Sequence, residues 1–483
     1  MGAALARMAA KRARRRCRRQ ARRPGRGRRD WSRSRAQYDA DAGKREGCGE
    51  DGEGGGDVGS DIEQERGGGP AGGSKSVYEL VVFADAFGRH PSSVQHLVRA
   101  VAVLRPGLRV LWVELPQRAP RLAWQDLLRM VERLLGVFVP RRTEKTAPSF
   151  ELTRLALFVL PWRFPARLAR LSDRLATSRI RRALRQLGFS TPAAWVVFPS
   201  ASGLAISLEL RPLVFYRVDD FALWPGVDAN AVRQDEARLI ACADLVVAPA
   251  QHLLPPQGGT AGIEESLSGG RPPVLSRQTM FLPHGVDSAH FAAVAGVHEN
   301  GSGISAKTDD PLAGIPHPRL LYAGLIDERI DAGLLLQTLE QLSEARLVLL
   351  GPMQQVPHEL VRHPRVVVRP GVSFAELPRW LHAADVLLLP YGRTPLGDSL
   401  APLKLRECVA TGLPVVSTAI PAAAAFDPCL LRFGDGLAFV EAVAEALREP
   451  PSARADRQQA MLDESWQARA AQLLDAMDRL YVA

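Results

Sequence analysis

Residues 384–418 constrain the fold of this chain more than any other stretch. An apolar run, Val386–Leu389, ends at a proline and is followed by a loop that contains Gly, Pro and Ser. The pattern then predicts a helix over Leu400–Ala410 that stops at Gly412, and a second buried strand over Pro414–Ser417. A strand, a polar loop, a helix and a strand in this order predict a parallel sheet with the loop at its carboxyl edge.

This loop and helix have the features of a phosphate site. Backbone N–H groups and the positive end of a helix meet phosphorylated ligands at the carboxyl edge of a parallel sheet. Lys404 and Glu407 are three residues apart and therefore share one face of the predicted helix. The lysine can meet a phosphate, and the glutamate can accept hydrogen bonds from a ribose. A solvated surface charge is an equally good interpretation of Lys404, whereas ligand binding is the better interpretation of Glu407.

Alternating strand and helix patterns occur in two halves of the chain. Residues 77–292 and 317–460 each predict a doubly wound, Rossmann-like α/β domain, and the second half has strands ending at Gly324 and Gly351. Residues 293–316 are rich in Gly, Ser and Asp, which is the composition of a linker. Two such domains joined by a linker are expected to face each other across a cleft that binds ligands.

The positive charge of the chain is concentrated at its amino end. The formal net charge is +10, yet the first 35 residues carry fifteen Lys and Arg against one Asp, and residues 36–76 carry ten acids and four bases. The rest of the chain is therefore close to neutral. Residues 1–76 have too few apolar side chains to fold, so we expect a disordered tail rather than an arm for nucleic acid or lipid. Nucleic acid is not an expected partner.

The cysteines and the apolar runs of the chain indicate the cellular compartment that we expect for the protein. The five cysteines are odd in number and form no CxxC pair, which favours free thiols in a reducing, cytoplasmic setting. No apolar run reaches the length of about eighteen residues that a membrane span needs. The Arg-rich start also has no apolar segment behind it, unlike a secretory signal.

One segment of the first half is strongly basic. Eight arginines lie between Arg163 and Arg185, and Asp173 is the only acid among them. A basic amphipathic helix of this kind is typical of proteins that bind an anionic membrane surface at its cytoplasmic face. An ordinary solvated helix face gives the same pattern, and the sequence leaves both interpretations open.

Candidate catalytic and acceptor residues follow strands of the first half. Residues 215–226 place Asp219 and Asp220 in a loop after an apolar strand, where carboxylates can hold sugar hydroxyls or act as a base. One of the two is expected to cap a turn, and Asp219 is the functional candidate. His90 and Ser92 precede the first helix and are acceptor-side candidates, although a serine there more commonly caps the helix.

Three segments carry a resemblance to a known family. PHGVDSAHF, residues 283–291, is similar to the PNGVD…F signature of retaining, family 4 type glycosyltransferases of the GT-B fold. Phe221 and Trp224 with the two aspartates resemble a D-D-F/W segment of the teichuronic acid biosynthesis glycosyltransferase subgroup. APLKLRECVATGLPVVST resembles that subgroup's SPLKLFEYLAAGKPVV. The resemblance covers about residues 77–483 and implies that a helix within 461–483 returns to the first domain.

The resemblance implies roles for residues that bind the donor sugar. Glu407 matches the second Glu of the family's E-x7-E motif and is implied to bind the nucleotide ribose. Ser399 stands where the first Glu touches the donor sugar, and the adjacent Asp398 is a possible substitute for it. Asp219 corresponds to the family's catalytic-loop histidine.

This chain differs from the resembled family at two residues of the diphosphate site. The Arg and Lys with which the family holds the donor diphosphate correspond to Leu325 and Ile330 here. Arg329 and Lys404 remain as cations, together with backbone N–H groups near Ser399 and Leu400. These are donor-site expectations that follow from the family alignment.

The function implied is transfer of a sugar, with retention, from a nucleotide-diphosphate donor to a polysaccharide or lipid-linked acceptor. No cofactor is expected, because the nucleotide sugar is itself a substrate. No metal is expected either, because the chain has no HExxH motif and no Ca²⁺-type aspartate spacing, so protein cations would neutralise the diphosphate. A catalytically degenerate binding or scaffold protein of the same fold is the alternative. A nucleotide-sugar epimerase is disfavoured, because its carboxylate set is not recognisable.

Overall fold

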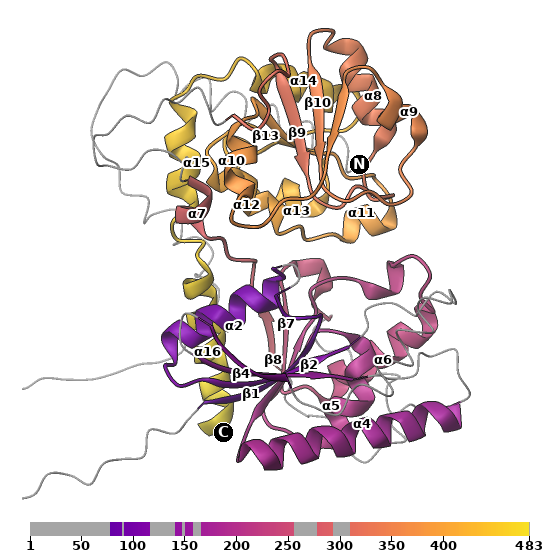
Figure 1. Cartoon of the computed structure of the whole chain (residues 1–483), viewed down its shortest axis with the longest axis vertical. Helices are drawn as coiled ribbons and strands as arrows, with labels where there is room; N and C mark the ends of the chain where they lie inside the picture. The colour runs from indigo at the N-terminus through magenta and orange to yellow at the C-terminus, as the bar shows by residue number, and fades with distance from the viewer. Residues whose placement is uncertain are drawn as a thin grey trace, which may run out of the picture. The chain divides into compact units, whose positions relative to one another are not determined.

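The computed structural model describes residues 78–88, 91–115, 141–146, 150–157, 166–255, 278–292 and 310–482. The predicted tail, His90 and residues 293–309 of the predicted linker lie outside these ranges. The described residues form two lobes, each built on its own sheet with helices on both faces (Figure 1).

The first lobe is built on an eight-stranded sheet with the order β3-β4-β2-β1-β5-β6-β7-β8. Every neighbouring pair is parallel except β3 and β4. The strands are β1 (Glu79–Ala84), β2 (Arg109–Glu114), β3 (Arg141–Thr146), β4 (Phe150–Ala156), β5 (Ala193–Val196), β6 (Leu213–Tyr216), β7 (Leu245–Ala248) and β8 (Gln278–Phe281). Strands β1, β5, β6 and β7 are buried along their whole length, as expected for a parallel sheet covered on both faces.

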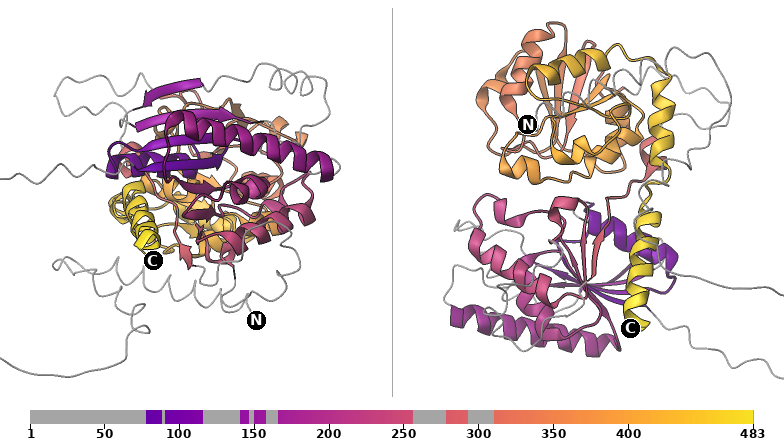
Figure 2. Two further views of the ribbon diagram at one scale, coloured as in Figure 1. Left: turned by 90° about the horizontal axis from the view of Figure 1, so that it is seen from below. Right: turned by 180° about the vertical axis from the view of Figure 1, so that it is seen from behind.

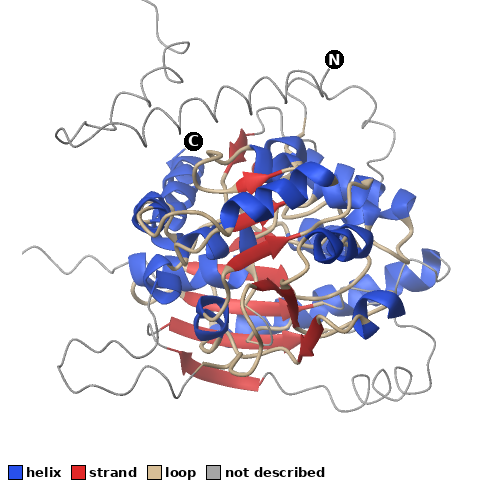
Figure 3. Ribbon diagram, turned by 90° about the horizontal axis from the view of Figure 1, so that it is seen from above, coloured by secondary structure: helices blue, strands red, loops and turns tan. Residues whose placement is uncertain are grey.

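The helices of this lobe follow the strands in the usual α/β alternation. They are α2 (Ser93–Leu104), α4 (Ala166–Leu187), α5 (Ser202–Leu208) and α6 (Ala229–Cys242), with 3₁₀ turns η2 (Pro199–Ala201), η3 (Phe221–Leu223) and η4 (Gln251–Leu253). Helix α7 (Ser288–Ala292) follows β8 in the chain but packs in the second lobe, where its residue Phe291 is buried. The arrangement of helices (blue) around strands (red) is visible in Figure 3.

The second lobe has a six-stranded sheet with the order β11-β10-β9-β12-β13-β14, and all its pairs are parallel. The strands are β9 (Arg319–Ala323), β10 (Arg346–Leu350), β11 (Val366–Arg369), β12 (Val386–Leu389), β13 (Val415–Ser417) and β14 (Arg432–Phe433). The helices are α8 (Ala332–Gln341), α9 (His358–Arg362), α10 (Leu377–His382), α11 (Pro395–Ser399), α12 (Lys404–Ala410), α13 (Pro421–Ala424), α14 (Leu437–Ala446) and α15 (Ala453–Met461).

Strand β12 shows how this sheet is buried. Leu387 and Leu389 contribute to the core on one face, whereas Val386 and Leu388 contribute to the core on the other. Successive side chains of a strand point to opposite faces, so an unbroken apolar run fills both cores. The chain order reverses between β9 and β12, and this is the point of a doubly wound sheet at which ligands bind.

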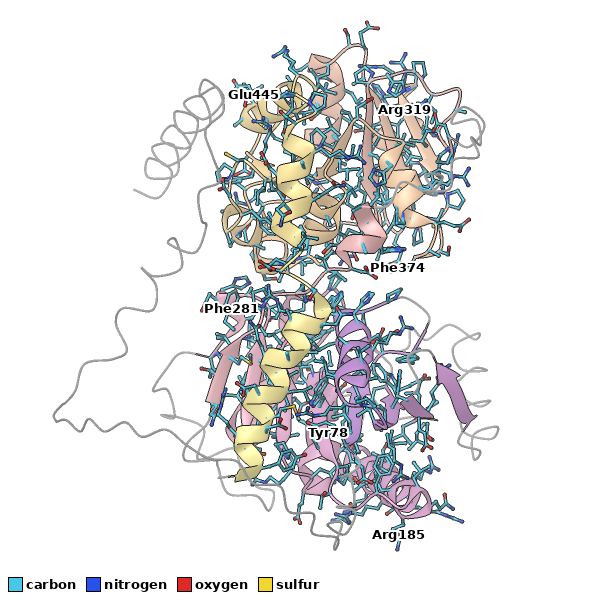
Figure 4. All side chains as sticks on the ribbon, turned by 90° about the vertical axis from the view of Figure 1, so that its left-hand side faces the viewer. Tyr78, Arg185, Phe281, Arg319, Phe374 and Glu445 are labelled. Atoms are coloured by element: carbon cyan, nitrogen blue, oxygen red, sulfur yellow. The ribbon has the colours of Figure 1, made fainter. Side chains whose placement is uncertain are left out.

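The last helix, α16 (Trp466–Val482), packs against α2 of the first lobe. Its residues Ala470, Leu473 and Met477 belong to the core of that lobe. The hydroxyl of Tyr78 donates to the sulfur of Met477 at 3.7 Å. The right-hand view of Figure 2 shows α16 in yellow along the first lobe, and Figure 4 labels Tyr78 beside it. The described part of the chain thus starts in one lobe, continues through the other, and ends against the first.

The predicted fold class, α/β with two doubly wound parallel sheets, is confirmed, but some predicted boundaries are wrong. The helix predicted over Leu400–Ala410 begins only at Lys404, and Leu400 is extended. Pro402 explains the difference, because a proline lacks the N–H of a helix and disfavours helical dihedrals in the residue before it. Leu312 and Ile315, which we assigned to the linker, are buried in the second lobe.

The expectation of free thiols holds at two described cysteines and is wrong at a third. Cys242 and Cys408 are free and buried. Cys408 packs in the second core, as predicted for a small core residue. Cys429 is disulfide-bonded.

Candidate functional site

Two glycines shape the carboxyl edge of the second sheet. Gly324 follows β9 and Gly351 follows β10, with φ of +148° and +147°, a region that side chains disfavour. A Cβ atom on Gly351 would overlap the carbonyl oxygen of Gly324. Both positions therefore require glycine, and the two loops lie against each other where the strands end.

Lys404 lies over this edge. A Cβ atom added to Gly324 would be 2.5 Å from the Cε atom of Lys404 and 2.9 Å from its Nζ atom. Within the described chain, the ammonium group has no ion pair or hydrogen bond. Lys404 is also the only lysine between residues 308 and 483, where arginine supplies every other permanent positive charge. A compact ammonium at a glycine-lined sheet edge is suited to a phosphate group.

Glu407 is a buried carboxylate near this lysine. Its side chain is only 9% exposed, and no hydrogen bond to it is found among the residues that the structure describes. Burial raises the pKa of the Glu407 carboxyl to about 7, and the charge of Lys404 opposes that shift. A carboxylate with so little exposure and no hydrogen bond among the described residues is suited to a ligand that donates hydrogen bonds.

The loop after β9 holds the second predicted cation. The Nε atom of Arg329 donates to both carboxylate oxygens of Asp327 at 2.9 and 3.0 Å, and its guanidinium is partly exposed. Ile330, which aligns with a lysine of the resembled family, is buried in a core of the second lobe. A charged side chain would therefore not fit at residue 330. Arg329 is the residue of this loop that can bring a positive charge to the sheet edge.

The predicted residues Asp398 and Ser399 end helix α11, which follows β12, and Leu400 comes directly after it. Arg393 donates to Asp398 at 2.6 Å, so this carboxylate is already paired. The Ser399 hydroxyl donates to the carbonyl of Leu396 at 2.7 Å. The N–H of Leu400 donates to a carbonyl of α11 at 3.3 Å, and the role predicted for N–H groups near Ser399 and Leu400 stays a prediction.

In the first lobe, one of the two aspartates caps a turn, as predicted, whereas the functional role of Asp219 stays a prediction. Asp220 caps η3 by accepting a hydrogen bond from the Ala222 N–H at 3.2 Å. Asp219 is half-buried and accepts from Trp224 Nε1 and from the Asp220 N–H, each at 3.0 Å. Burial raises the pKa of Asp219 to about 6, and these hydrogen bonds and the charge of Arg329 oppose the shift. The electrostatic effect of Arg329 links this loop to the second lobe.

Sequence reasoning missed a third carboxylate, Asp85, which directly follows β1. The Ser92 hydroxyl donates to Asp85 Oδ1 at 3.1 Å, and Gln95 Nε2 donates to Oδ2 at 3.3 Å. Ser92 occupies the N-cap position of α2 but makes no side-chain cap. The position of Asp85 after a buried strand is the same signal that identified Asp219, so it could have been found.

Histidines connect the donor-side loop to the first lobe. His252 Nε2 lies 2.9 Å from the carbonyl of Ser399, and His284 Nε2 lies 3.0 Å from the carbonyl of Ala401. A carbonyl oxygen can only accept, so both Nε2 atoms carry the proton. Burial lowers the pKa of His284 to about 3, which keeps it neutral. The structural role predicted for His284 fits these contacts.

The second lobe has a recognisable family. Residues 317–449 match the family model described as "Glycosyl transferases group 1". The match spans this lobe from β9 to α14. It contains Gly324, Arg329, Gly351, Lys404 and Glu407, so the donor-side candidates all come from the matched region.

Curated relatives match shorter segments. A Bacillus subtilis (strain 168) protein, provisionally named teichuronic acid biosynthesis glycosyltransferase TuaH, is 36% identical over 63 residues, which are 13% of this chain and 16% of that protein. A D-inositol 3-phosphate glycosyltransferase of Xylanimonas cellulosilytica is 32% identical over 117 residues, which are 22% of this chain and 27% of that protein. The chain thus aligns with less than a third of the length of either relative.

Solved structures match nearly the whole of the described chain. A sucrose-phosphate synthase of Thermosynechococcus elongatus superposes with a TM-score of 0.58 at 16% identity, covering 84% of this chain and 99% of that one. The Anabaena protein HepE, solved with UDP and glucose, superposes with a TM-score of 0.51 at 13% identity, covering 82% and 99%. At these identities the likeness concerns the fold. It confirms the predicted GT-B architecture, and the group 1 match with the Bacillus subtilis relative supports the resemblance to the teichuronic acid subgroup.

The described residues lack two features, a metal-binding cluster and a membrane-spanning helix. No group of three or more His, Cys, Asp or Glu in these residues is arranged to hold a metal ion. No helix among them is long and apolar enough to cross a bilayer.

Proposed function

We propose that this protein is a glycosyltransferase that moves a sugar from a nucleotide-diphosphate donor to a polysaccharide or lipid-linked acceptor. The observation that carries the proposal is the pair Lys404 and Glu407. Among the described residues, Lys404 over Gly324 has no ion pair and the little-exposed Glu407 carboxylate has no hydrogen bond, and both lie at the reversal point of the sheet that matches the group 1 model. The pair complements a diphosphate joined to a ribose.

The donor site would neutralise the leaving diphosphate with protein charge. Lys404 would contact the phosphates, Arg329 would add charge from the loop after β9, and Glu407 would accept hydrogen bonds from the ribose. Cations held in a fixed geometry stabilise a leaving group as its charge develops. Catalysis without metal and with retention of configuration are parts of this proposal, and the resemblance to retaining family 4 type enzymes supports retention. Analysis of the anomer formed first would test it.

The acceptor would bind on the first lobe. Asp219, whose pKa is raised by burial and lowered in part by the charge of Arg329, would hold the acceptor hydroxyl near the donor phosphates. Asp85 and Ser92 form a second polar group after β1 on the same sheet. Carboxylates and hydroxyls at such loops suit the hydroxyl groups of a sugar acceptor.

We further propose that α4 binds the cytoplasmic face of an anionic membrane. Ala176, Ile180 and Leu184 bury one side of this helix. The other side exposes arginines, among them Arg182 and Arg185, the latter labelled in Figure 4. Basic residues beside an anionic bilayer contribute about 1 kcal/mol each.

Replacing Arg182 and Arg185 with Gln is therefore expected to weaken binding to phosphatidylglycerol vesicles about tenfold or more, measured by cosedimentation. Vesicles of phosphatidylcholine alone serve as the comparison. Replacing two exposed arginines of the second lobe, Arg362 and Arg448, is the matched control and is expected to change little. Equal losses for both pairs would show that α4 has no special role.

A binding or scaffold protein without catalysis is a second candidate. The apolar residues Leu325 and Ile330, where the resembled family has cations, favour it, and Ile330 is built into the core. This candidate differs from the first in predicting that nucleotide sugars are bound weakly and are not consumed.

A thermal-shift panel tests the proposed function. Uridine, guanosine, adenosine, cytidine and thymidine diphosphates and their sugar conjugates are each added to the full chain, with and without EDTA. We expect one nucleotide series to raise the melting temperature in both conditions, because a ligand at 100 times its Kd stabilises by about 2.7 kcal/mol. No shift with any of them would exclude the transferase, and a shift lost in EDTA would exclude the metal-free site.

A further inference from the structure

The turn Ser399–Ala401 is held by the first lobe although it belongs to the second. Its carbonyls accept hydrogen bonds from His252 and His284 at 2.9 and 3.0 Å. The Ala401 side chain packs on a small apolar cluster of the first lobe that includes Leu253. Two hydrogen bonds and an apolar contact therefore seat this turn on the other lobe.

Both histidines are themselves fixed. His252 lies in η4, where the carbonyl of Leu253 accepts a hydrogen bond from Arg217 at 2.8 Å. Arg217 is in turn ion-paired with the buried Glu236 at 3.0 Å. On the other side, His284 Nδ1 lies 3.5 Å from the Tyr216 hydroxyl at the end of β6. The two donors are thus built on the scaffold of the first sheet.

The seated turn leads directly into the donor site. Pro402 follows Ala401 and restricts the backbone, and α12 begins with Lys404. A displacement of Ala401 would therefore be passed on to Lys404 and Glu407. These contacts make the position of the donor groups dependent on the first lobe.

We propose that His252 and His284 are positioning residues, which hold the Ser399–Ala401 turn so that Lys404 and Glu407 are placed to bind a nucleotide diphosphate. This inference rests on the proposed function for its ligand. The seating itself is a property of the protein without ligand and can be measured separately. Neither histidine is required to touch the substrate.

The test uses full-length His252→Ala, His252→Gln and His290→Ala variants. His252 has an exposed side chain, so its loss leaves the cores intact. Gln keeps an N–H donor near the Nε2 position and should rescue the contact. His290 is the control, because its Nε2 donates to a carbonyl within the second lobe, that of Phe374 at 2.9 Å, and not to the turn. His284→Gln adds a conservative change at the second, buried histidine.

Two quantities are measured on each variant. Amide hydrogen exchange over residues 396–403 reports the seating without ligand. The Kd of the nucleoside diphosphate that gave the largest thermal shift reports its effect on the donor site. We expect His252→Ala to speed exchange and to raise the Kd about three- to tenfold, the worth of one hydrogen bond. His252→Gln should recover most of both, and His290→Ala should change neither.

Each other outcome overturns a defined part of the inference. Unchanged exchange in His252→Ala means that the histidine does not hold the turn. Faster exchange with an unchanged Kd means that seating does not position the donor groups. If the wild-type protein binds none of the nucleoside diphosphates, the proposed function and the donor part of this inference fail together, while the exchange data still decide the seating.

Discussion

Replacing Glu407 with Gln is expected to make the ligand-free protein more stable and, at the same time, to remove its response to nucleotide. The free energy of unfolding should rise by about 1–2 kcal/mol at pH 8. The Kd for the nucleoside diphosphate should rise at least about tenfold, because a hydrogen bond to a charged group contributes about 1.5–3 kcal/mol. A gain in stability with a loss of binding is the behaviour of a residue kept for its ligand.

The stability gain follows from the raised pKa of Glu407, which is about 7 in the folded protein. The ordinary pKa of a glutamate is 4.5, and that of Glu407 in the folded protein is about 7. At pH values between these two, the folded state binds the proton more tightly than the unfolded state does. The contribution of this group to stability therefore falls as the pH rises through that range and stays low above it. A shift of one pKa unit is worth about 1.36 kcal/mol, from which the cost of burying an unpartnered amide must be subtracted.

Chemical denaturation at pH 5 and pH 8 measures the stability part of this prediction. The advantage of the Gln variant should be small at pH 5 and larger at pH 8. Glu79→Gln is the matched control, because Glu79 is equally buried but accepts hydrogen bonds from Arg109 and from the Ser190 and Thr191 N–H groups. That variant should lose stability and keep nucleotide binding. A destabilised Glu407→Gln would indicate that this carboxylate has structural partners.

Replacing Lys404 with Met should weaken binding of the nucleoside diphosphate about ten- to a hundredfold while leaving the much weaker binding of the corresponding nucleoside unchanged. Methionine keeps most of the apolar length of the side chain over Gly324 but removes the positive charge. Charge-assisted hydrogen bonds to phosphate are the stronger ones in proteins. The loss should therefore be confined to ligands that carry phosphate.

Titration calorimetry with the diphosphate and the nucleoside measures this difference. Arg346→Met serves as the control, because it removes one positive charge from the same lobe at the first residue of β10, the opposite end of the strand from Gly351. It should leave both affinities unchanged. If Lys404→Met weakens both ligands equally, the lysine supports the shape of the site and does not hold the phosphates.

Much of the fold could be predicted because its signals are local. Unbroken apolar runs such as Val386–Leu389 predict strands covered on both faces, and alternating helical patterns predict the parallel order. The polar strand β3, Arg141–Thr146, has no such pattern and was missed. The start of α12 was predicted four residues too early, because the helical pattern of apolar residues extends back to Leu400. The backbone restriction of Pro402 determines where the helix begins.

The site was predictable only in part, since much of it depends on tertiary contacts. Spacing placed Lys404 and Glu407 on one face, but the burial of Glu407 and the approach of Lys404 to Gly324 depend on how α12 packs against the sheet. The contact of His252 with Ser399 joins residues 147 apart in the sequence. Nothing near either residue in the sequence indicates it.

The central claim, that the group 1 domain binds a nucleotide diphosphate at the edge formed by β9, β10 and α12, is tested most directly by mapping amide hydrogen exchange with and without the best nucleoside diphosphate. We expect ligand-dependent protection in two segments, residues 324–331 and 399–410, and little change along α4. Protection confined to the first lobe, or none at a saturating concentration, would contradict the account.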